Sequence, residues 1–117
     1  SNLINNIKNQ LHKNLNIHFS LSEEFSYSLF PKPNFTFQEI KFLYQDKKFA
    51  SVDKMRIYIS LSNLFASNDI RIKNINLNKV NFDLNKKNYN FFTNLLNNNF
   101  SNFKLEIENS NIFYRDI

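Results

Sequence analysis

The residues that could carry catalytic or metal chemistry are sparse and poorly placed for it. His12 and His18 are six positions apart, with no carboxylate at a spacing typical of a metal site, so we expect exposed or partly packed histidines. Glu23 and Glu24 are adjacent and would point to opposite faces of a strand, which prevents them from acting as a catalytic pair. Neither histidine is placed to activate a serine. The sequence therefore predicts a non-enzymatic protein without a metal or a cofactor.

The composition excludes several further classes of site. The chain has 117 residues and contains no Gly, Cys or Trp. Phosphate-binding loops, dinucleotide fingerprints and nucleophile elbows need Gly where the backbone approaches a ligand or turns under strain. Without Cys there is neither a disulfide scaffold nor a Cys-ligated zinc site. Asn makes up about a fifth of the chain, which we interpret as compositional bias at tolerant polar positions rather than a polar ladder.

The net charge of +5 is compatible with weak attraction to anionic lipid or to nucleic acid. Lysines pair up at two expected turns, Lys47 with Lys48 and Lys86 with Lys87. Aromatic residues are plentiful, as in proteins that bind single-stranded nucleic acid, but no aromatic-basic ribonucleoprotein motif is present. We therefore interpret the lysine pairs as solvated loop charges and keep nucleic-acid binding as a second alternative.

The N-terminal stretch has the periodicity of an amphipathic helix, which we assign to residues 1–14. Such a helix would dock on the sheet that follows or, alternatively, lie on a membrane surface. Its apolar residues recur at spacings of three and four: Leu3, Ile4, Ile7, Leu11 and Leu15. From residue 15 to residue 117 the period changes to two, which predicts strands.

The alternation of apolar residues is interrupted in the same way more than once. Phe35 and Phe37 share one face, and a two-residue gap then shifts the apolar set to Ile40. Similar gaps follow Ile72 and Leu77. A change of face inside a strand indicates a β-bulge.

The interrupted strand also recurs, since Phe35, Ile70 and Leu105 are 35 positions apart. A period in this range predicts stacked supersecondary units. Between the strands we expect a helical turn or loop at residues 62–67 and a short helix at residues 89–97. A tight turn at residues 108–111 should lead into an antiparallel partner strand. The predicted fold is mainly β (α+β): the helix, then a curved antiparallel repeating sheet that forms an open trough or half-barrel, with short helices between strands.

Three segments resemble the AsmA family. Residues 31–42 (PKPNFTFQEIKF) are similar to its proline-led strand near the N-terminus. Residues 55–65 (MRIYISLSNLF) resemble its strand that ends in Leu-Leu or Leu-Phe, and residues 70–77 (IRIKNINL) resemble the strand that follows. The chain departs from the family pattern in having Asn-rich turns where the family often has Gly.

The resemblance implies a periplasmic part of a bacterial envelope protein that is anchored to the inner membrane by a preceding helix. Because the chain starts with Ser1, we expect it to be an excerpt. The implied ligands are phospholipid acyl chains, carried between the inner and outer membranes or used in outer-membrane biogenesis. Other envelope proteins are further expected partners, and nucleic acid is not. The alternative is a structural scaffold that regulates envelope assembly. The candidate lipid contacts, or core residues, are Met55, Ile57, Ile59, Ile75, Leu77, Phe82 and Leu84.

Overall fold

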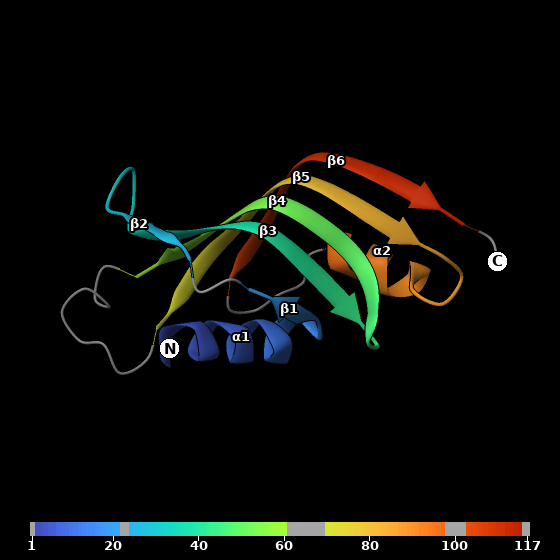
Figure 1. The fold of residues 1–117 in the computed structure, drawn as a ribbon, viewed down its shortest axis with the longest axis horizontal. Coiled ribbons are helices and arrows are strands. Elements are labelled where there is room, and N and C mark those ends of the chain that lie inside the picture. The colour runs from blue at the N-terminus through green and yellow to red at the C-terminus, as the bar shows by residue number, and fades with distance from the viewer. Residues whose placement is uncertain (1, 22–23, 61–69, 98–102, 116–117) are drawn as a thin grey trace.

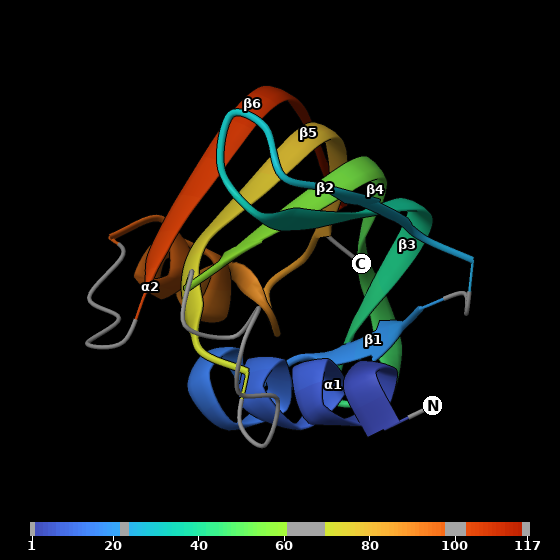
Figure 2. The same cartoon turned by 90° about the vertical axis from the view of Figure 1, so that its left-hand side faces the viewer.

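One bent sheet of six strands arches over two helices (Figures 1 and 2). The computed structural model describes residues 2–21, 24–60, 70–97 and 103–115. In chain order the elements are α1 (Asn2–Leu15), β1 (His18–Ser20), β2 (Ser26–Ser28), β3 (Asn34–Tyr44), β4 (Lys47–Ile59), β5 (Ile72–Leu84), α2 (Tyr89–Asn97) and β6 (Lys104–Tyr114). The fold is mainly β, as the period of two predicts. The helical turn or loop expected at residues 62–67 lies outside the described residues.

The N-terminal helix docks under the sheet. The side chains of Ile4, Ile7, Leu11 and Leu15 form one stripe along α1, and none is more than 5 % exposed. The helix ends at Leu15, and the next residue, Asn16, has a positive φ of 57° and donates its backbone N–H to the carbonyl of His12 at 2.9 Å. Asn tolerates this left-handed conformation better than most residues, which makes it a suitable helix terminator. Docking on the sheet, rather than exposure for a membrane surface, is therefore the arrangement in this structure.

The strand order in the sheet is β1-β3-β4-β5-β6, and β2 also pairs with β3. All pairs from β1 to β5 are antiparallel, but β5 and β6 are parallel. The prediction of a wholly antiparallel sheet is therefore wrong at this edge. A parallel pair needs a crossover connection of a dozen or more residues, and α2 lies within that connection.

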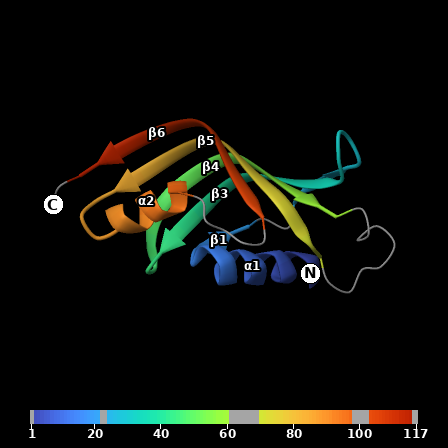
Figure 3. The ribbon, with the colours of Figure 1, turned by 180° about the vertical axis from the view of Figure 1, so that it is seen from behind.

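The strands of the sheet are arched, as Figure 3 shows. The pairing register places Glu39, Asp53, Lys79 and Asn109 opposite one another on β3, β4, β5 and β6. Three of the four have positive φ: Glu39 at 54°, Lys79 at 58° and Asn109 at 56°. We call this row the bend. On each strand it leaves two successive outward-facing residues, which confirms the change of face predicted by the gaps after Phe37 and Leu77. The pairing register continues unshifted across the bend, so the β-bulge predicted at these two gaps is wrong, and residues in the left-handed conformation change the face instead. The gap after Ile72, in contrast, lies at a register shift between β4 and β5.

Replacing Glu39 should test how much backbone strain the bend holds. Glu39→Val should lower the free energy of unfolding by about 1–2 kcal/mol, because β-branched residues fit the left-handed region poorly. Glu39→Gly should raise it by up to about 1 kcal/mol, because Gly adopts this φ without a steric penalty. Urea denaturation measures both changes. The neighbouring Gln38 is also exposed but lacks a positive φ, so an equal loss in Gln38→Val would contradict this account.

The register corrects the repeat that the sequence suggested. Across the sheet, Phe35 pairs with Ile57, Ile57 with Ile75, and Ile75 with Leu105. The equivalent positions on the three strands that run in the same direction are therefore 35, 75 and 105, not 35, 70 and 105. The bend residues on these three strands, Glu39, Lys79 and Asn109, have the same uneven spacing in the sequence. Regular spacing was misleading because β5 contains two gaps, after Ile72 and after Leu77. The repeat aligned the first of them with the gap after Phe37, whereas the register aligns the second.

Two further features of β6 differ from expectation. The strand runs without interruption from Lys104 to Tyr114, so the tight turn predicted at residues 108–111 is wrong. The polar residues 108–111 lie where β6 crosses the bend. On the outer face, asparagine amides link β6 to β5: Asn109 donates to Asn78 at 3.1 Å and Asn111 to Asn81 at 3.2 Å. These asparagines do form cross-strand contacts, which composition alone did not predict.

Candidate functional site

The seven residues chosen from the sequence lie together on the concave face of β4 and β5. Met55 pairs with Leu77 and Ile57 with Ile75 across the two strands, so their side chains share one face. All seven are at least 96 % buried: Met55, Ile57, Ile59, Ile75, Leu77, Phe82 and Leu84. In this conformation they are core residues.

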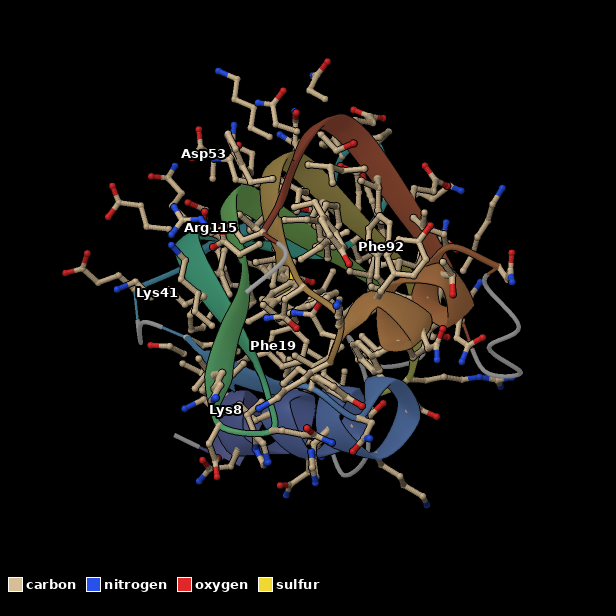
Figure 4. The ribbon with its side chains drawn as sticks, turned by 90° about the vertical axis from the view of Figure 1, so that its right-hand side faces the viewer. Lys8, Phe19, Lys41, Asp53, Phe92 and Arg115 are labelled. Atoms are coloured by element: carbon tan, nitrogen blue, oxygen red, sulfur yellow. The ribbon has the colours of Figure 1, made fainter. Side chains whose placement is uncertain are left out.

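The concave face is covered by three elements. From below, α1 and β1 close it, and Phe19 of β1 packs edge-to-face on Phe42 of β3 with ring centroids 4.4 Å apart. At the other end α2 covers it with Phe92, as Figure 4 shows. A small apolar pocket between these elements has no room for a water molecule. This part of the concave face is therefore a packed core.

The apolar face continues past this cover onto β6. Ile112 pairs with the buried Phe82 and Tyr114 with the buried Leu84, so both point to the concave side. They are nevertheless 54 % and 49 % exposed. The ring of Tyr89 at the start of α2 reaches only the end of this strand, with its centroid 6.1 Å from that of Tyr114. Among the described strands, β6 forms one edge of the sheet and exposes apolar side chains on the concave face. Near the opposite edge, Tyr27 of β2 pairs with the buried Phe35 and is 42 % exposed on the same face.

The partner strand that the sequence predicts after residue 111 contains Ile112 and Tyr114, but these residues are not among the predicted lipid contacts. The alternation of Ile112 and Tyr114 could have identified them as residues on the concave face of the same strand. It was assigned to a separate strand because the polar residues 108–111 resemble a hairpin turn.

The residues considered for chemistry form no cluster. The rings of His12 and His18 stack with centroids 4.1 Å apart, and both side chains are exposed. Glu24 is exposed, whereas Glu23 lies outside the described residues. In the part of the chain that the structure describes, no three His, Cys, Asp or Glu side chains are grouped as a metal site would require. The absence of enzymatic activity stays a prediction.

The lysine pairs lie closer together than separate solvated turns would require. Lys47 and Lys48 at the start of β4, and Lys86 and Lys87 after β5, line one surface pocket together with Arg115. We call it the basic pocket. Sequence reasoning missed this convergence, although pairing Val52 with Val80 would have placed the start of β4 beside the end of β5.

Comparison with known protein families identifies the family to which the chain is similar. The model of the AsmA family matches residues 1–112. No curated protein and no solved structure matches the chain at a significant level. Among the described residues, no helix is long and apolar enough to cross a membrane.

Proposed function

This chain belongs to the AsmA family, whose members are associated with the bacterial envelope, and we propose that it forms the closed end of an apolar β-trough for phospholipid transport. The trough would carry acyl chains between the inner and outer membranes, or supply them for outer-membrane biogenesis. It would lie in the periplasm on a protein anchored to the inner membrane. Its chemistry is non-enzymatic: it shields apolar chains from water.

The exposure of Ile112 and Tyr114 carries this proposal. Exposed apolar groups on an otherwise buried face mark a surface that continues into a ligand, another strand or a partner. At the sealed end, α1 and β1 fill the concavity, which would stop an acyl chain from passing further. Lipid would therefore contact the exposed apolar side chains of β6. The seven residues on β4 and β5 that the sequence suggested as contacts are buried and would stabilise the sheet beside the lipid.

A second candidate function is a structural scaffold for other envelope proteins. The packed core favours it, since the pocket under β4 and β5 has no room even for water. In that case Ile112 and Tyr114 would contact protein and no acyl chain would approach them. The third candidate, nucleic-acid binding, has the net charge, the aromatic content and the basic pocket in its favour.

Photo-crosslinking from one strand separates these functions. A photoreactive amino acid at Ile112, in the full-length protein in cells, should give phospholipid adducts several-fold more often than the same amino acid at Asn111. The two positions are adjacent and exposed but face opposite sides of the sheet, and Asn111 is hydrogen-bonded to Asn81. Mass spectrometry of the adducts provides the readout.

Two results would contradict the transport proposal. Equal lipid adducts at both positions would mean non-specific contact with membrane. Protein adducts alone at Ile112 would support the scaffold instead.

A further inference from the structure

The basic pocket lies at the end of the sheet where β3, β5 and β6 finish and β4 begins, close to the C-terminal end of the described chain (Figure 1). Its volume is about 660 Å³, which is within the range of small-ligand sites. Three separate segments contribute cations: the start of β4, the turn after β5, and the end of β6. Figure 4 looks onto this end of the molecule, with Arg115 labelled. The lining consists of Lys47, Lys48, Asp83, Leu84, Asn85, Lys86, Lys87, Phe113 and Arg115.

The turn that carries Lys86 and Lys87 is held by two asparagines. Asn85 Oδ1 accepts hydrogen bonds from the backbone N–H groups of Lys87, at 2.8 Å, and Asn88, at 3.1 Å. In return, Asn88 Oδ1 accepts from the N–H of Asn85 at 2.9 Å, and its Nδ2 donates to the carbonyl of Asp83 at 3.0 Å. Asn88 is 93 % buried. The backbone under these lysines is therefore fixed before any ligand arrives, which reduces the entropy lost on binding.

The other two segments are fixed as well. Arg115 donates its backbone N–H to the carbonyl of Leu84 at 2.9 Å, which ties the end of β6 to the end of β5. Lys47 is held by its pairing with Tyr44 across a two-residue turn, Gln45 and Asp46, whose φ angles are both positive. All three segments thus present their cations from ordered backbone.

The pocket carries a marked excess of positive charge. Five cations and one carboxylate line it among the described residues. The carboxylate of Asp83 lies 3.6 Å from the Lys48 ammonium, and both side chains are about half exposed, so their attraction contributes little. Like charges in one concavity repel one another, and a bound anion would relieve that repulsion.

We propose that the basic pocket binds a phosphate group, as a phosphate ester whose apolar or glycerol part lies against Phe113. Lysine and arginine together match the charge and the multiple acceptor oxygens of phosphate. The volume exceeds what inorganic phosphate needs, and the half-exposed ring of Phe113 supplies an apolar wall. Either a phospholipid headgroup or a soluble phosphate ester provides this chemistry. The inference goes beyond the trough, because the pocket faces the end of the sheet and does not require acyl chains on the concave face.

NMR titration of the protein with three probes tests this proposal. The probes are inorganic phosphate, glycerol 3-phosphate and dihexanoylphosphatidylglycerol below its micelle concentration. The amide signals of Lys47, Lys87 and Arg115 should shift saturably, and glycerol 3-phosphate should bind more tightly than phosphate. The double variant Lys87→Gln/Arg115→Gln should bind about tenfold more weakly, because it loses charge-assisted hydrogen bonds.

The control is Lys41→Gln/Lys73→Gln, which removes the same charge from exposed positions outside the pocket and should leave binding unchanged. Tighter binding of the lipid than of glycerol 3-phosphate would assign the pocket to headgroups, and equal binding would assign it to soluble esters. A single-stranded oligonucleotide, titrated in the same way, serves as a fourth probe. An equal loss in the control pair, absence of saturable shifts with the three phosphate probes, or tighter binding of the oligonucleotide than of glycerol 3-phosphate would overturn the proposal. Failure of lipid crosslinking at Ile112 would leave these titrations unaffected.

Discussion

Phe49→Ala should lower the free energy of unfolding by about 3–5 kcal/mol, the range for removing a fully buried aromatic ring. Phe49 is 0 % exposed and lies at the centre of an aromatic cluster. Its ring centroid is 5.2 Å from that of Phe91 and 5.6 Å from that of Phe82, both at edge-to-face angles. The ring thus joins β4 to β5 and to α2, so its loss leaves a cavity and also removes favourable aromatic pairs. Urea denaturation followed by circular dichroism gives the free energy of unfolding directly.

The matched control for this variant is Phe113→Ala. Phe113 is also a strand phenylalanine, but it is 53 % exposed on the outer face of β6. Its replacement should change the free energy of unfolding by less than about 1 kcal/mol, as for most exposed positions. Similar losses in the two variants would mean that α2 does not pack on β4 and β5 as described.

The aromatic cluster also shows what sequence patterns can predict. The spacing of Phe91, Phe92 and Leu95 predicted the short helix, which extends from Tyr89 to Asn97. The pattern did not predict that Phe49 lies beneath it, because that contact joins residues 42 positions apart through the register of β4 and β5. Local periodicity identifies which side of an element is apolar. Which element covers that side is decided by tertiary packing, to which a single sequence gives no direct access.

The change of face inside the strands was the most accurate sequence-based prediction, although left-handed residues cause it rather than the predicted bulges. The edge strand was the least accurate. Two-residue gaps after Phe37 and Leu77 predicted local changes of face, and the structure has positive φ at Glu39 and Lys79. A similar run of polar residues at 108–111 led to the prediction of a hairpin turn, whereas these residues lie inside β6. The two cases look alike in sequence because polar pairs suit both a turn and a change of face inside a strand. Only the parallel pairing with β5 distinguishes them.

The candidate site was predicted in part. The seven residues lie on one apolar face, as their alternation predicted. Their burial was not predicted, because it depends on where α1 and α2 dock. The basic pocket was not predicted, because it is formed by the start of β4 and the ends of β5 and β6. These strand ends meet only in the folded sheet. Charge pairs in turns are usually solvated, so the pattern of Lys47, Lys48, Lys86 and Lys87 gave no reason to expect convergence.

Leu11→Asp should detach α1 from the sheet and lower the free energy of unfolding by at least about 3 kcal/mol. Leu11 is 0 % exposed and faces Ile17, Met55 and Leu77 in the apolar pocket. A carboxylate there would lose its hydration without gaining a partner from these apolar side chains, which costs more than the cavity left by Ala. Asn9→Asp introduces the same charge on the exposed side of α1 and should change stability by less than about 0.5 kcal/mol.

The same pair of variants tests what the helix does for function. If α1 seals the trough, its detachment should uncover the concave face of β4 and β5, and Leu11→Asp should bind an apolar dye or short-chain phospholipid that the Asn9→Asp protein does not. Those apolar side chains would then become accessible to acyl chains, as an apolar trough requires. Unchanged stability in Leu11→Asp would instead show that α1 is not docked in solution. The helix would then be free to lie on a membrane surface, and the closed end of the trough would have to be formed by β1 alone.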